Sequence, residues 1–316
     1  MIDFELKILE QKDFSSLYKK ERNFDMNVIW SKYVQGTNTL YYSRKLRFDD
    51  LFEQQYRQLF DLDTSRTLKV LEIGCGPGAL AGAIHRWYPN AEITAVDRDS
   101  EFIRFASEHE DGISFMEGDA TRLAFEDNTF DVTISNTVAE HIEPSGFYGE
   151  QFRVLKPGGK CLVLSSRRGI NITPACVMEL NDFEQAFWKK AREYDTSFET
   201  YSVCKYPMNE AEMPITMEKY GFRNIRTGYA TIDLTPDHPR FSSRLAHDMI
   251  NAERYSALDS IDSVFETMPE HYNAQEVTEM KRLANMKYDT RIEQYNRGEK
   301  QWDTNVSVIM VIQGTK

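Results

Sequence analysis

Short apolar runs alternate with helix-length segments through the middle of the chain, from about Leu68 to Ser166. The runs that indicate strands are 70–73, 92–96, 113–116, 130–135 and 161–164. This alternation predicts an α/β domain of parallel strands joined by right-handed crossovers. In open sheets of this kind ligands bind beyond the carboxyl ends of the strands, so the residues that follow each run are the candidates for function.

The segments before and after this alternation show other patterns of apolar residues. Residues 1–63 predict a mostly helical cap, with apolar positions at three- and four-residue spacing and a loop at 30–37. Helices are expected at 177–193 and 209–220, and strands at 227–233 and 305–312. The predicted domains are a cap at 1–63, a core at 64–235, a helical insertion at 236–301 and a closing strand at 302–316. The insertion would cover the acceptor pocket or make a dimer contact.

A glycine-rich loop follows the first run. Glu72 ends the apolar stretch, and Gly74, Gly76 and Gly78 alternate with cysteine and proline before a helix expected near Ala79. Glycine lets a backbone approach a ligand closely, and a helix N-terminus offers unpaired N–H groups. The loop fits the dinucleotide pattern G-x-G-x-x-G/A only weakly, so it predicts a nucleotide-like ligand without naming it.

Asp97 ends the second run, about one βαβ step after the loop. A carboxylate at this strand tip can accept hydrogen bonds from both hydroxyls of a ribose. The alternative is that Asp97 caps the helix expected from about Ser100.

Taken in order, these motifs resemble the core of class I S-adenosylmethionine-dependent methyltransferases. The resemblance rests on the loop after Glu72, on Asp97, on Gly118-Asp119-Ala120 after the third run, and on Leu-Lys-Pro-Gly-Gly at 155–159. It covers about a third of the chain. It implies a doubly wound, seven-stranded, mostly parallel sheet with an antiparallel last strand, an N-terminal helical lid and a helical insertion before that strand.

The resemblance also implies S-adenosyl-L-methionine as cofactor, S-adenosyl-L-homocysteine as product, and methyl transfer by in-line displacement to a small-molecule acceptor. The implied cofactor-binding residues are Glu72, Gly74, Cys75, Gly76, Gly78, Asp97, Arg98, Gly118, Asp119, Ala120 and Asn136. Holding the acceptor and the methyl group in line can supply on the order of 7–11 kcal/mol of the barrier, so catalysis mainly by positioning is expected.

Acid–base chemistry has one candidate pair near this edge, Glu140 and His141. His141 could take a proton from the acceptor, because the reference pKa of histidine lies near neutrality. Neighbouring residues on a helix point about a hundred degrees apart, however, so a local structural role for the pair is the alternative. Candidate substrate-binding residues are Tyr33, Tyr41, Arg44, Arg167 and Asn171. Their alternatives are helix packing for the first three and a solvated basic turn at 165–171 for the last two.

The composition of the chain limits the kinds of binding partner that we expect. A net charge of −12 argues against nucleic acid and against anionic membranes. The four cysteines are scattered and form no C-x-x-C pair, and the histidines show no metal-like spacing, so neither disulfides nor a metal site are expected. No signal peptide or membrane-spanning apolar run is visible, and we expect a cytoplasmic monomer or homodimer.

Two other classes of function stay open. One is a non-catalytic S-adenosylmethionine-binding module that keeps the fold. The other is an NAD-dependent oxidoreductase, which Glu72 before the glycines, Gly-Asp-Ala after the third run and the antiparallel closing strand disfavour.

Overall fold

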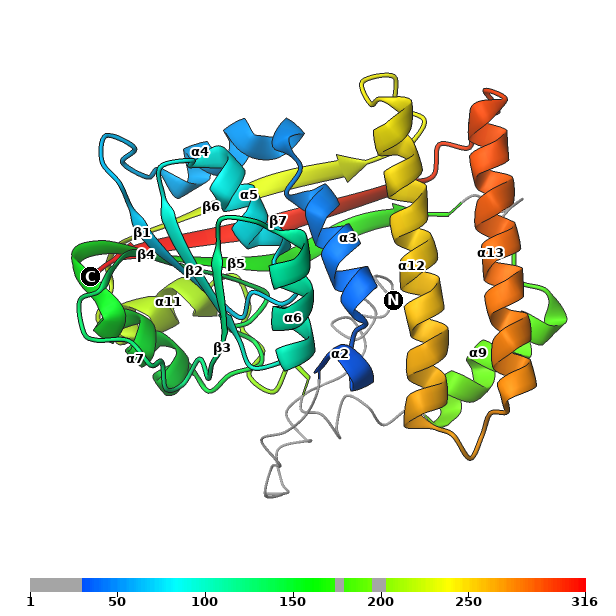
Figure 1. Ribbon diagram of the computed structural model, residues 1–316, viewed down its shortest axis with the longest axis horizontal. Helices are drawn as coiled ribbons and strands as arrows, with labels where there is room; N and C mark the ends of the chain where they lie inside the picture. Colours follow the sequence, from blue (N-terminus) through cyan, green and yellow to red (C-terminus); the bar gives the residue numbers. More distant parts are fainter. Residues whose placement is uncertain (1–29, 174–178, 195–202) are drawn as a thin grey trace. The chain divides into compact units, whose positions relative to one another are not determined.

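The computed structural model describes residues 30–173, 179–194 and 203–316 (Figure 1). These residues group into two compact units. The sheet unit holds residues 37–167, 203–232 and 307–316. The helical unit holds residues 30–36, 168–173, 179–194 and 233–306. The domain boundaries expected from the sequence stay a prediction.

Seven strands form one sheet in the order β3-β2-β1-β4-β5-β7-β6. Their bounds are β1 Lys69–Ile73, β2 Glu92–Asp97, β3 Ser114–Glu117, β4 Phe130–Asn136, β5 Leu155–Ile172, β6 Arg223–Leu234 and β7 Thr304–Thr315. The strands β1 to β5 pair in parallel, with Leu71 opposite both Thr94 and Thr133 in the central ladders. Strand β1 is therefore buried in the middle of the sheet, as its unbroken apolar run indicates.

The last strand runs against its neighbour. The N–H of Gly158 donates to the carbonyl of Lys316 (3.0 Å), and the N–H of Lys316 donates to the carbonyl of Gly159 (3.0 Å), so the end of β7 lies beside the beginning of β5. Figure 1 shows β7 running opposite to β6 as well. The predicted mostly parallel, seven-stranded sheet with an antiparallel last strand is confirmed.

Two helices of the sheet unit begin where the sequence supplies a capping side chain. Helix α6 starts after Asp99, whose side chain accepts from the N–H of Glu101, and α7 starts at Pro144 after the capping side chain of Glu143. The bounds are α3 Thr37–Arg47, η2 Asp50–Phe52, α4 Glu53–Phe60, α5 Ala79–Trp87, α6 Ser100–His109, α7 Pro144–Val154 and α11 Glu212–Lys219.

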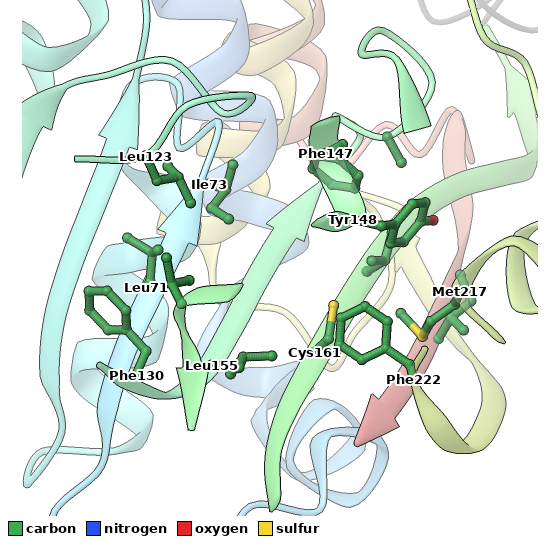
Figure 2. Close-up of a cluster of buried hydrophobic side chains, with 14 of the residues drawn as sticks. Leu71, Ile73, Leu123, Phe130, Phe147, Tyr148, Leu155, Cys161, Met217 and Phe222 are labelled. Atoms are coloured by element: carbon green, nitrogen blue, oxygen red, sulfur yellow. The ribbon is translucent and has the colours of Figure 1, made fainter. Parts of the chain in front are cut away.

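The core of the sheet unit is shown in Figure 2. It is built from the inward side chains of β1, β4 and β5 and from residues of α7 and α11, all buried: Leu71, Ile73, Phe130, Phe147, Tyr148, Leu155, Cys161, Met217 and Phe222. Burial of these aromatic and aliphatic groups anchors the strands whose carboxyl ends carry the candidate site.

The helical unit contains α2 Trp30–Tyr33, α9 Asp182–Tyr194, α12 Ser243–Thr267 and α13 Ala274–Asn296. The two long helices α12 and α13 lie side by side (Figure 1) and make up most of the predicted insertion. Arg291 of α13 is fully buried and is neutralised by Asp237 (2.9 Å) and Asp303, which flank the helix pair in the sequence. Within the described residues no helix is long and apolar enough to cross a membrane.

Two loop predictions are wrong. Residues 30–33 form one helical turn, closed by the N–H groups of Val34 and Gln35 on the carbonyl of Trp30. The loop expected at 165–171 is strand, because β5 continues to Ile172. Its pairing with β4 ends at Leu164, but its other hydrogen-bonded neighbour, β7, is itself 12 residues long and can satisfy the extended backbone.

Replacing Phe222 by alanine should cost about 3–5 kcal/mol of unfolding free energy, because Phe222 is fully buried and packs edge-on against Phe152. The control is Tyr229→Ala on β6, where the side chain is half exposed and the change should stay within about 0.5 kcal/mol. Urea unfolding followed by circular dichroism measures both, and equal losses would contradict the assigned core.

Candidate functional site

The glycine loop between β1 and α5 takes conformations that other residues resist. The backbone φ angles of Gly74, Gly76 and Gly78 are +68°, +53° and +89°. Such left-handed angles favour glycine because it has no Cβ to clash with the backbone. The chain thereby turns within five residues from a buried strand into helix α5, which begins at Ala79.

The surroundings give two of these glycines different tasks. A Cβ on Gly74 would lie 2.5 Å from Cγ2 of Val138, so this glycine is needed for close packing. A Cβ on Gly76 would meet nothing within 4 Å, so the space beside this glycine is open. The loop is anchored by the N–H of Gly74, which donates to the carbonyl of Val96 at 2.8 Å.

Asp97, at the end of β2, holds the loop with its side chain. Its Oδ2 accepts from the N–H of Gly76 at 2.8 Å, and its Oδ1 accepts from the N–H of Asp99 at 2.9 Å. Asp99, and not Asp97, caps helix α6, so the helix-cap alternative for Asp97 is wrong. A carboxylate has about four acceptor positions, and two stay available to a ligand. Burial raises the pKa of Asp97 above its ordinary value, while the two backbone donors oppose that rise.

Glu72, the penultimate residue of β1, is buried beneath the loop. Its Oε2 has no hydrogen-bond partner among the residues that the structure describes. Burial, together with the nearby charge of Asp97, raises the pKa of Glu72 well above its usual range. A buried carboxyl with an unused acceptor is costly by itself, so Glu72 is a candidate binding position.

Asn136 ends β4 at the same edge, and Thr137 follows it. The Oδ1 of Asn136 is buried and lacks a partner within the described part of the chain. Thr137 has a φ of 53°, a strained value for a residue with a branched side chain, and its N–H donates to the carbonyl of Leu164 at 2.8 Å. Arg44 of α3 donates from Nη2 to the Thr137 hydroxyl at 3.2 Å. The structure thus brings Arg44, predicted as a substrate-binding residue, next to Asn136.

The loop after β3 reaches the same edge through the backbone. The N–H of Gly118 donates to the carbonyl of Asp97 at 2.8 Å. Asp119 is exposed, and its Oδ1 accepts from both the N–H and the hydroxyl of Thr121 (2.8 Å each). Ala120 is partly buried beside it, and the charge of Arg98 acts on the neighbouring Asp97. The predicted cofactor-binding residues therefore gather along the carboxyl ends of β1, β2, β3 and β4.

The Glu140–His141 pair lies in a turn after β4, not on a helix. The Glu140 carboxylate accepts from the Ser165 hydroxyl through Oε1, and its buried Oε2 has no partner among described residues. The Nδ1 of His141 accepts from the N–H of Cys204 at 2.9 Å. Sequence reasoning missed Cys204, because no motif surrounds it and its partner lies far away in the chain.

The other predicted substrate residues are more scattered. The Tyr41 hydroxyl donates to Oε1 of Glu110 at 2.9 Å. Arg167 lies on β5 and donates from Nη1 to the carbonyl of Met208 at 2.8 Å. Tyr33 and Asn171 belong to the helical unit, Tyr33 as the last residue of α2 and Asn171 exposed on β5. Among the described residues, Arg44 thus contacts Thr137, directly after β4, whereas Arg167 contacts Met208, far along the chain.

The cysteines and the possible metal ligands are the remaining candidates for chemistry. Cys75 and Cys161 are buried free thiols, Cys204 is a partly buried free thiol, and Cys176 lies outside the described residues. Burial raises the pKa of the Cys75 and Cys161 thiols, so neither is an activated nucleophile. The part of the chain with defined placement contains no group of three or more His, Cys, Asp or Glu that could hold a metal ion.

Comparison with known proteins identifies the segment that carries this edge. Residues 71–163 match the family described as a methyltransferase domain. The ubiquinone/menaquinone biosynthesis C-methyltransferase of Desulfotalea psychrophila is 36% identical over 104 residues, which are 31% of this chain and 41% of that protein. The fatty-acid O-methyltransferase of Mycolicibacterium smegmatis is 37% identical over 103 residues, 31% of this chain and 37% of that protein. The match thus spans less than half the length of these relatives.

Among solved structures, phosphoethanolamine N-methyltransferase 2 of Haemonchus contortus, in complex with phosphomonomethylethanolamine and S-adenosylhomocysteine, superimposes with a TM-score of 0.51 at 18% identity. The superposition covers 93% of this chain and 61% of that one. It shows a shared Rossmann-like α/β fold.

Replacing Glu72 by glutamine should make the protein without ligand more stable at neutral pH. The raised pKa means that the folded state holds its proton more tightly than the unfolded chain, where the value is about 4.3. The Glu72 contribution to stability therefore falls as pH rises above about 4 towards the folded pKa. The stability gain of Glu72→Gln should grow over this range, by about 1.4 kcal/mol per pH unit at most.

Urea unfolding between acid and slightly alkaline pH measures this gain. Glu126→Gln is the control, because Glu126 is exposed and should give a flat difference. A gain that stays constant with pH for Glu72→Gln would show that the carboxyl is not held in its protonated form.

Proposed function

We propose that this protein, whose residues 71–163 form a methyltransferase domain, transfers a methyl group from S-adenosyl-L-methionine to a small-molecule acceptor. The observation that carries the proposal is the Asp97 carboxylate. It is held against the N–H of Gly76 at a point where the space beside the glycine loop is open. A ligand with a ribose and an adenine fits a loop built in this way.

The hydrogen-bond donors of the cofactor match the acceptors at the carboxyl edge of the sheet. S-adenosyl-L-methionine presents ribose hydroxyls, an adenine amino group and an ammonium group, all of which donate hydrogen bonds. The edge offers the free acceptor positions of Asp97, the exposed carboxylate of Asp119, and buried oxygens of Glu72 and Asn136 that lack described partners. Carboxylate charge also suits a cationic ligand.

Each residue then has a defined task. Asp97 would accept from the ribose hydroxyls, Asp119 from the adenine amino group, and Asn136 would lie beside the methionine end, facing the acceptor. When bound, the cofactor supplies a methyl group made electrophilic by the adjacent positive sulfur. The protein supplies position and excludes water, and alignment of this kind contributes on the order of 7–11 kcal/mol.

The acceptor is proposed only as a class. The names of the relatives refer to quinone biosynthesis and to fatty acids, and the similar solved structure contains phosphomonomethylethanolamine, which supports a small molecule and no single acceptor atom. The net charge of −12 supports the absence of a nucleic-acid partner and of an anionic membrane surface. A cytoplasmic location and a monomer or homodimer belong to the same proposal.

Calorimetric titration should give micromolar binding of S-adenosyl-L-methionine and S-adenosyl-L-homocysteine and none of NAD. Asp97→Ala should weaken both by about 1.5–3 kcal/mol, because a charge-assisted contact is lost. Binding of NAD alone would overturn the proposal in favour of an oxidoreductase. Binding without methyl transfer to any tested quinone, fatty acid or amine would favour a non-catalytic module.

Gly76→Ala and Gly158→Ala form a matched pair. Both glycines have left-handed φ angles (+53° and +78°), and at both a new Cβ would meet nothing within 4 Å. Each variant should therefore lose a similar stability, about 1 kcal/mol. Only Gly76→Ala should lose affinity for S-adenosyl-L-homocysteine, because only its Cβ occupies the space beside the cofactor loop. Equal affinities in the two variants would remove Gly76 from the site.

A further inference from the structure

A segment far along the chain closes against the turn after β4. We name residues 203–208 the closing segment. Among the described residues, three hydrogen bonds tie it to the turn after β4 and to β5: the N–H of Cys204 to Nδ1 of His141 (2.9 Å), the N–H of Tyr206 to the carbonyl of Glu140 (2.8 Å), and Nη1 of Arg167 to the carbonyl of Met208 (2.8 Å). Two of the three end on the Glu140–His141 pair.

The first bond fixes the chemistry of the His141 ring. A nitrogen that accepts a hydrogen bond carries no proton, so the neutral ring has its proton on Nε2. Adding a proton at Nδ1 would place N–H against N–H and break the bond to Cys204. Nδ1 is therefore occupied as an acceptor and is not available as a general base.

The backbone of Cys204 has a strained conformation at the point where its N–H donates to His141. Its φ is +54°, a left-handed value that costs free energy for any residue with a Cβ. Such conformations persist where the surroundings determine them. Here the N–H of Cys204 donates to Nδ1 of His141, so this bond is one of the contacts that fix the residue.

The turn links the closing segment to the cofactor side. Val138, three residues before His141, packs against Gly74 of the glycine loop, where even a Cβ would come within 2.5 Å of it. The N–H of His141 donates to the carbonyl of Val138 at 3.0 Å. Asn136 lies immediately before this turn, so the closing segment flanks the side of the edge proposed to face the acceptor.

We propose that His141 is a positioning residue, which uses Nδ1 to hold the closing segment as the wall of the acceptor side of the site. The role of this segment as a wall of the acceptor pocket rests on the proposed methyl transfer. The hydrogen bond between His141 and Cys204 can be tested without any catalytic turnover. The positioning role replaces acid–base chemistry at His141 with a hydrogen bond that shapes the pocket. The segment that it holds lies outside the residues that match the methyltransferase family.

The inference also predicts a dependence on pH. Among the described residues, the charged and titratable groups on the elements joined by these bonds include Glu140 in the turn, Arg167 on β5, and Cys204, Lys205 and Tyr206 in the closing segment, with Tyr148 of α7 acting electrostatically with Glu140 and Arg167. Protonation of His141 would remove the acceptor for Cys204, so the closing segment should open as the solution becomes acidic.

The test is amide hydrogen exchange of Cys204 and Tyr206 in the full chain without cofactor, in His141→Asn and His141→Gln. Asparagine places its amide oxygen near the position of Nδ1, whereas glutamine places it near Nε2. At about pH 7.5 we expect exchange at Cys204 within about threefold of the parent in His141→Asn and at least about tenfold faster in His141→Gln. Between about pH 7.5 and 5.5, protection should fall in the parent and not in His141→Asn, after correction for intrinsic exchange.

Cys204→Gly is the second variant, because glycine adopts the left-handed φ without strain and keeps the N–H. It should keep its protection with His141 present. Equal exchange in the asparagine and glutamine variants, or the same pH dependence in the parent and His141→Asn, would overturn the inference. Titration with S-adenosyl-L-homocysteine runs in parallel. Loss of that binding in the parent would contradict the proposed function, whereas the exchange result would still decide the role of His141.

Discussion

The candidate site depends on one partly buried carboxylate. Asp97 accepts from the backbone N–H groups of Gly76 and Asp99, which belong to the loops after β1 and β2. Its own carbonyl accepts from Gly118, at the end of β3. Three loops are thereby joined to a single residue, because a carboxylate withdrawn from water needs donors and loop N–H groups need acceptors. The starting points of α5 and α6 follow from this arrangement.

The same edge carries polar atoms that the fold itself does not satisfy. Oε2 of Glu72 and Oδ1 of Asn136 are buried without partners among the described residues, and each such group costs about 1–3 kcal/mol. The aromatic and aliphatic core around Phe147 and Phe222 offsets this cost. Unsatisfied acceptors next to a tightly packed core are typical of a site formed in advance for a ligand that donates hydrogen bonds.

The two sides of the edge differ in how they are built. On the cofactor side, the loops follow their strands directly, and the family match at 71–163 covers them. On the acceptor side, Arg44 comes from α3, Arg167 from the extended part of β5, and Cys204 from a segment far along the chain. These residues lie outside the matched region. The comparisons therefore support the cofactor more strongly than they support any acceptor.

The sequence by itself determined the strands of the core, the glycine loop and the place of Asp97, because these depend on local patterns: apolar runs, a left-handed turn and a strand tip. The continuation of β5 to Ile172, the acceptor role of Nδ1 in His141 and the contact of Arg44 with Thr137 were decided by the tertiary structure alone. The last two are hydrogen bonds between groups that lie far apart in the chain, 63 residues for His141 and Cys204 and 93 for Arg44 and Thr137, and the first depends on the neighbouring strand β7. No local periodicity encodes such a pairing, since its geometry exists only after the sheet has assembled.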